Sequence, residues 1–151
     1  MAEQARQQLV LLGAHRSAAA AALVVAQAAT SLGLRDEAEA AVARAEESLA
    51  ESPDPMLAAW AAVGRGTLHN DYDELPDAAR EFTRARGLLV DAPVTVANAL
   101  ATLELSRALR RQGELGPASL LIDEALHLFA RIGDVHMYSY ALDARAEVSL
   151  A

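Results

Sequence analysis

The sequence predicts an all-α protein in which antiparallel helix pairs stack side by side in a right-handed superhelix. Hydrophobic residues make up 53% of the chain and aromatic residues 4%. The apolar residues are mostly Ala and Leu, which are strong helix formers. The chain also matches itself with a period of 40 residues, and a fixed period of this size is typical of stacked helix pairs.

The repeat is clearest in two stretches, LGLRDEAEAAVARAEESL at 32–49 and QGELGPASLLIDEALHLF at 112–129. A third copy lies halfway between them, with Asp at the turn instead of Gly. Asp is among the few residues that tolerate a left-handed backbone. Each copy has a turn residue, a small residue, a large apolar residue and a second small residue: Gly33-Ala38-Val42-Ala45, Asp73-Ala78-Phe82-Ala85 and Gly113-Ala118-Ile122-Ala125.

The same period extends to both termini, where Gly13 lies 120 positions before Gly133. We therefore expect a single domain over 1–151, with a half repeat at 1–13, repeats at about 14–53, 54–92 and 93–133, and a terminal helix at 134–151. Each repeat is a helix pair, and prolines lie near several helix starts, where the missing N–H costs little. The expected helices are 2–12, 15–32, 35–51, 54–70, 75–90, 93–112, 115–131 and 134–150.

The small residues of the pattern indicate where two helices of a pair come close together. Ala38, Ala78 and Ala118 occupy the contact, and the large apolar residue that follows each of them fills the core. The alternative is an ordinary Ala-rich helical bundle whose self-similarity is accidental. Three turn-plus-Ala matches at one period favour the repeat.

These residues resemble the tetratricopeptide repeat family, whose pattern has the same residue types at the same spacings. Gly66 also matches the small residue in the middle of that family's first helix. The period differs from the family's value of about 34, and the first helices lack most of its large aromatics, although Trp60 lies near such a position. The longer repeat is similar to those in sensory regions of bacterial regulators, including LuxR-type and SARP-type transcription factors and STAND-type ATPases. Residues 131–148 are particularly similar in style.

Composition narrows the classes of partner and compartment. The net charge of −8 argues against a nucleic-acid surface. The chain has no Cys, which fits the reducing cytoplasm. Residues 17–29 imitate a signal sequence but are too short to cross a bilayer as a helix. We therefore expect a cytoplasmic protein that does not bind a membrane.

The sequence predicts no catalytic residues, cofactor or metal site. The four histidines His15, His69, His127 and His136 show no close metal-ligand spacing. The stretch DYDELPDAARE at 71–81 begins like a calcium loop, but Pro76 occupies the place that needs Gly. GRGT at 64–67 is too short for a phosphate loop.

The resemblance implies that the first helix of each pair lines a concave binding groove. Position by position, this gives the candidate groove residues Gln27, Trp60, Thr67, Asn70, Leu103, Arg107, Arg110, Arg111, Tyr140 and Asp143. Further positions of the same helices are Leu23, Thr30, Val63, Asp71 and Glu147. The family's carboxylate clamp is not reproduced, because the corresponding places hold Leu23, Gln27, Gly64, Leu100 and Glu104.

Arg107, Arg110 and Arg111 lie on neighbouring turns of one helix face, where they could receive an acidic ligand. The alternative is that they pair with acidic residues of adjacent helices. Our leading hypothesis is a non-catalytic module that binds a protein or peptide segment. An acidic peptide is the first kind of ligand to test. A small-ligand-sensing regulatory domain is the alternative, and an enzyme with a non-local site is a distant third. Apolar half-repeat ends also suggest a homo-oligomer.

Overall fold

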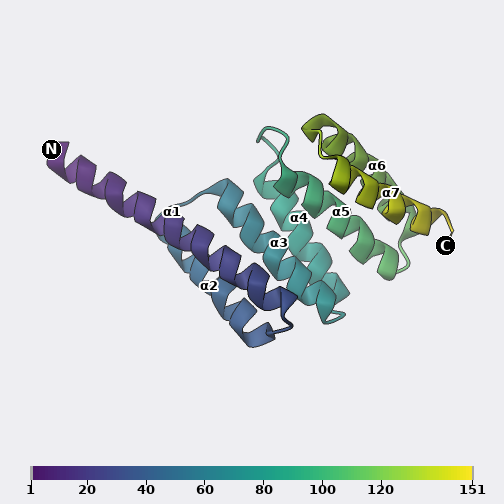
Figure 1. Ribbon diagram of the computed structural model, residues 1–151, viewed down its shortest axis with the longest axis horizontal. Helices are drawn as coiled ribbons and strands as arrows, with labels where there is room; N and C mark the ends of the chain where they lie inside the picture. Colours follow the sequence, from purple (N-terminus) through teal and green to yellow (C-terminus); the bar gives the residue numbers. More distant parts are fainter. Residues whose placement is uncertain (1, 151) are drawn as a thin grey trace.

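The computed structural model describes residues 2–150, with side chains from residue 4 onward, so positions 1 and 151 of the expected domain lie outside it. Within this range the chain is all-helical, with seven helices and no strand (Figure 1). Their bounds are α1 Ala2–Ser31, α2 Arg35–Glu51, α3 Pro55–Asp71, α4 Leu75–Leu88, α5 Val96–Arg111, α6 Leu115–Ile132 and α7 Val135–Ser149. The expectation of an all-α protein is confirmed.

The helices pack mainly on their neighbours in the chain. The most extensive contacts join α1 to α2, α3 to α4, and α5 to α6. In addition, α1, α3, α5 and α7 contact one another in order, so the odd-numbered helices form a continuous row across the molecule (Figure 1). This row positions the candidate site described below.

Within each helix pair, the turn has the left-handed residue that the repeat predicts. The backbone angle φ is +71° at Gly33, +63° at Asp73 and +86° at Gly113. In each case the next residue donates its N–H to a carbonyl five residues back, such as Glu74 to His69 at 2.8 Å. This bond satisfies a carbonyl that the helix end leaves open. The prediction of an Asp that replaces Gly at the second turn is confirmed.

Side-chain caps explain where three of the odd-numbered helices begin. Asp54, Thr95 and Asp134 accept backbone N–H groups in the first turns of α3, α5 and α7. These caps stand about 40 residues apart, which is the period of the repeat. Because Thr95 is the cap, α5 begins at Val96, and the expected start at residue 93 was too early.

The expected break at Gly13 is wrong, because α1 runs without interruption through it. The residue 120 positions before the cap Asp134 is Ala14, which has no side-chain acceptor. A glycine in a helix costs only about 1 kcal/mol. Without a cap to start a new helix, the chain continues as one 30-residue helix.

The first half of α1 extends beyond the rest of the fold (Figure 1). Leu9, Val10 and Leu11 are 70%, 63% and 59% exposed. The second half packs on α2 and α3 through a row of small buried residues, beginning with Ala19. The free part therefore exposes an unusually apolar surface.

The segment Gln4–Ser31 of α1 is long and apolar enough to cross a membrane, and a window of 18 residues within it has a mean hydropathy of 1.8. Such a helix near the N-terminus is weak evidence for a span, since core helices and signal sequences share these properties. Because Gly13 does not interrupt the helix, the apolar stretch is longer than residues 17–29 and is not too short to cross a bilayer. However, residues 4–18 span only about 22 Å, against about 30 Å of hydrocarbon. A span would therefore have to separate the second half of α1 from α2.

The small residues of the repeat are buried, as predicted. Ala38, Ala78 and Ala118 are fully buried, and so are the large residues that follow them. Gly66 of α3 lies against the ring of Phe82 of α4. A Cβ atom on Gly66 would lie 2.7 Å from Cε1 of the Phe82 ring, which is nearer than two carbon atoms can pack.

We expect Gly66→Ala to destabilise the protein, because the added methyl group meets the buried Phe82 ring. Overpacking of this kind costs about 1–3 kcal/mol, which exceeds the gain in helix propensity of about 1 kcal/mol. Gly64→Ala is the matched control, since its nearest neighbour, Cγ2 of Val42, would be 3.8 Å away. Urea unfolding should show Gly64→Ala more stable than Gly66→Ala. Equal stabilities would mean that the α3–α4 contact is looser than described.

Candidate functional site

The row of odd-numbered helices contains a polar hollow of about 530 Å³. It brings together residues from four helices that are far apart in the sequence. Eight of the ten candidate groove residues line it: Gln27, Trp60, Thr67, Asn70, Arg107, Arg110, Arg111 and Tyr140. The remaining lining residues are Val63, Asp71, Leu100 and Glu104.

Two candidate residues do not line the hollow. Leu103 is fully buried and packs with Ile122 and Phe129 of α6. The face of α5 that borders the hollow instead has Leu100, Glu104, Arg107 and Arg111, at intervals of four, three and four residues. Leu103 lies three residues after Leu100 and four before Arg107, so helical spacing alone did not exclude it from this face. Asp143 is exposed on α7 and lies outside the hollow.

An apolar hollow of about 310 Å³ lies next to the polar one, between α1 and α3. The two share Gln27, Trp60, Val63 and Thr67. Trp60 therefore borders both, and together they form one groove, which we call the α1–α7 groove. Its apolar part is formed by α1 and the first half of α3, and its charged part by the C-terminal halves of α3 and α5 with α7. The apolar part is lined by Ala20, Leu23, Val24, Ala26, Thr30, Leu57 and Gly64 in addition to the shared residues.

Arg107 is held by residues of its own chain. Its Nη1 lies 3.3 Å from a carboxylate oxygen of Glu104. It also donates to the Tyr140 hydroxyl, and its guanidinium carbon lies 4.9 Å from the centre of the Tyr140 ring. Arg107 therefore joins α5 to α7 while it lines the groove.

The other two arginines bridge helices in the same way. Arg110 lies 2.9 Å from the carboxylate of Glu147 on α7. Arg111 lies 2.7 Å from the Asp73 carboxylate and donates to the backbone oxygen of Asn70 at 2.9 Å. Arg110 and Arg111 thus pair with acidic residues outside their own helix, as the alternative explanation of the cluster expected, whereas the carboxylate partner of Arg107 is Glu104 of the same helix.

The two carboxyl groups of the groove differ in their partners. Burial raises the pKa of Glu104, although the Arg107 charge opposes this increase. Loss of solvent also raises the pKa of Asp71, with Arg111 opposing it at a distance. Among residues 4–150, Asp71 has no ion pair or hydrogen bond to its carboxylate, so its charge is not compensated by direct contact.

The uncharged polar groups of the groove differ in whether they already have a hydrogen-bond partner. The hydroxyl groups of Thr30 and Thr67 donate to backbone oxygens one turn earlier, at 2.8 Å and 3.0 Å. In the described part of the chain, the Gln27 amide and the Trp60 indole have no such partner. The groove therefore offers apolar surface, two hydrogen-bonding groups and one unpaired carboxylate.

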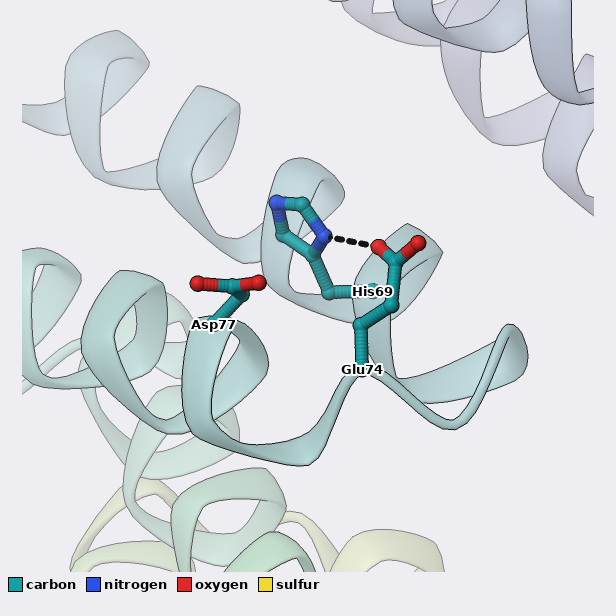
Figure 2. A group of neighbouring side chains, drawn as sticks. All are labelled: His69, Glu74 and Asp77. Carbon is teal, nitrogen blue, oxygen red and sulfur yellow. Dashed lines mark hydrogen bonds and ion pairs between the residues drawn. The ribbon is translucent and has the colours of Figure 1, made fainter.

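Sequence analysis did not anticipate a cluster of potential metal ligands formed by His69, Glu74 and Asp77. Their ligand atoms lie within 4.8 Å of one another, because the turn after α3 brings residues five and eight positions apart together. Figure 2 shows the His69 ring facing the Glu74 carboxylate, with Asp77 on the first turn of α4. His69 Nδ1 and Glu74 Oε2 are 2.5 Å apart.

This cluster is already neutralised by its own chain. Arg35 contacts both oxygens of Glu74 at 2.9 Å and 3.1 Å, and Arg80 lies 2.5 Å from Asp77. The hydrogen bond with His69, followed by the one from Arg35, lowers the pKa of Glu74. The carboxylates also lie at the start of α4, where the helix dipole disfavours a cation. We assign the cluster to stabilisation of the α3–α4 turn.

Comparisons with protein-family models, with curated proteins and with solved structures gave no match.

We expect Glu104→Gln to change how stability depends on pH. Burial raises the folded-state pKa of Glu104 above its ordinary value, so the folded state binds more protons between the unfolded and folded pKa values. The wild type should therefore lose stability relative to Glu104→Gln as the pH rises through that interval. Urea unfolding at about pH 4 to 8 measures this difference, with the exposed Glu114→Gln as a control. Parallel profiles for wild type and Glu104→Gln would contradict the expected effect of burial.

Proposed function

We propose that the protein is a non-catalytic interaction module of the tetratricopeptide type, which binds a protein or peptide segment in the α1–α7 groove. The observation that carries this proposal is the groove itself, because it crosses α1, α3, α5 and α7. Its apolar surface beside Trp60 suits a side-chain anchor, since Trp is a frequent energetic centre of interfaces. The groove is also long enough for an extended segment.

We propose that the helices form a right-handed superhelix of the tetratricopeptide type, and the helix contacts support its stacked arrangement. The odd-numbered helices touch one another in order, whereas α2, α4 and α6 each contact the odd-numbered helices before and after them but not one another. Such an arrangement curves with the odd-numbered helices on the inner side. Together with the 40-residue repeat and its left-handed turn residues, it supports membership of a long-repeat variant of this family.

The second candidate function is a sensory domain that binds a small molecule and regulates an attached output domain. The apolar hollow of about 310 Å³ favours it, because its size is near the lower limit for ligand pockets and its few polar groups converge beside Trp60. A peptide would use both parts of the groove. A small apolar ligand would use the α1–α3 part alone.

Within the same proposal, the protein acts in the cytoplasm through binding, with no catalytic step and no cofactor. The net charge of −8 supports a partner other than nucleic acid. The absence of cysteine is consistent with a reducing compartment.

We expect Thr67→Arg to weaken peptide binding, because Thr67 borders both parts of the groove and a long side chain there would fill it. Thr83→Arg is the matched control, since Thr83 is exposed on α4 away from the groove. Randomised displayed peptides selected on the wild type provide the ligands, and titration of the single tryptophan's fluorescence measures affinity. Thr67→Arg should weaken binding about tenfold or more. Equal binding by both variants would place the site elsewhere.

We also propose that the free half of α1 packs against a second copy of this chain. Leu9 and Leu12 are 70% and 40% exposed, and they occupy the repeat positions of Phe129 and Ile132, 120 residues later. Phe129 is fully buried and Ile132 packs beside it in the core of the third pair. Large apolar residues at these repeat positions therefore pack on another helix in the third pair, and we propose that Leu9 and Leu12 do so on a second copy.

We expect Leu9→Gln/Leu12→Gln to reduce self-association without lowering the melting temperature, because these side chains do not contribute to the core of one chain. Sedimentation over a range of concentrations measures the change. The exposed Leu120→Gln on α6 is the control. A wild type that stays monomeric at high concentration would show that α1 has a different role.

A further inference from the structure

We infer that the α1–α7 groove selects a basic segment, with an apolar side chain beside Trp60 and a Lys or Arg side chain at Asp71. This inference rests on the proposed peptide-binding function and specifies the chemistry of its ligand. It reverses the sign expected from the sequence, where the three arginines pointed to an acidic ligand. The reason is the way in which the charges of the groove are paired.

Three guanidinium groups and two carboxylates line the charged part of the groove, and the carboxylates of Glu147 and Asp73 pair with two of these arginines from outside the lining. Each arginine lies within 3.3 Å of one carboxylate: Arg107 with Glu104, Arg110 with Glu147, and Arg111 with Asp73. The fourth carboxylate, Asp71, lines the groove with no direct partner in the described chain. The unpaired charge of the groove is therefore negative.

An acidic ligand would have to compete with these pairs. At Arg110 or Arg111 it meets a guanidinium group whose charge Glu147 or Asp73 already compensates, so it has to share that group with the carboxylate or displace it. A basic ligand at Asp71 adds an ion pair without breaking another. Exposed ion pairs are weak individually, so we expect the groove to prefer a basic over an acidic ligand only modestly.

Two further charges favour a cation at this position. Asp71 is the last residue of α3, where the negative end of the helix dipole attracts positive groups. The chain as a whole has a net charge of −8, which raises the local concentration of basic ligands and slows the approach of acidic ones.

The positions of Trp60 and Asp71 set the spacing of the two ligand groups. They lie eleven residues apart on α3, which corresponds to about 16 Å along the helix. An extended peptide covers about 3.3 Å per residue, so its basic residue lies roughly five positions along the chain from its apolar anchor, with about four residues between them. The rest of the groove between them is lined by Val63 and Thr67 of the same helix.

The test uses three synthetic peptides that differ only in charge. Each has two leucines, a Gly/Ser spacer of about four residues chosen from the spacing above, and three terminal residues that are Lys, Ser or Glu. None contains Trp, so emission from Trp60, the single tryptophan, reports binding to the full protein. Asp71→Asn is the test variant, and Asp91→Asn, at an exposed site in the α4–α5 loop, is the control.

The Lys peptide should bind about fivefold more tightly than the Ser peptide, and the Glu peptide more weakly than either. Asp71→Asn should remove the preference for Lys, whereas Asp91→Asn should retain it. Tighter binding of the Glu or Ser peptide, or a Lys preference that survives Asp71→Asn, would overturn the basic specificity and leave peptide binding in place. If none of the three peptides binds, peptide binding by the groove fails and the basic specificity fails with it.

Discussion

Phe82 of α4 lies directly over Gly66 of α3, and this contact sets how closely the two helices approach. A Cβ atom at Gly66 would overlap the ring, so the distance between the helices depends on the smallest possible side chain. The corresponding position 40 residues earlier is Ala26, and 40 residues later it is Ser106, both of them buried. Close packing of each pair leaves the opposite sides of the odd-numbered helices free to contact one another. The groove forms on these sides.

The ion pairs give this row of helices its polar connections. Arg111 joins α5 to the α3–α4 turn, and Arg110 joins α5 to α7. Each arginine holds two helices together as well as lining the groove, so its charge is largely neutralised by the fold. The charge that a ligand meets is then determined by the carboxylate without a partner. A count of basic and acidic residues on one helix face does not reveal this, because the partners come from other helices.

The N-terminal part of the chain shows how much the repeat depends on local signals. The self-match that places Gly13 with Gly133 is real, yet only Gly133 ends a helix. The difference lies in the next residue, because Asp134 caps α7 and Ala14 has no side chain with which to cap. The result is one long helix whose first half extends from the fold. Its apolar residues lie at positions that are buried in the third pair. They are exposed here because no other helix of the described chain covers this part of α1.

The sequence by itself determined the helical class, the left-handed turn residues and the burial of the small residues, including Ala78 and Ala118. These features depend on local backbone preference and on helical spacing, which a single chain segment expresses without its neighbours. It also placed eight of the ten groove residues on the faces that line the hollow. Only the tertiary structure decided the rest: that Leu103 lies in the core, that His69 meets Glu74 and Asp77 across a turn, and that Asp71 remains unpaired while the arginines do not. Those outcomes depend on contacts between residues 33 to 41 positions apart or across a turn, whose distances no local pattern specifies.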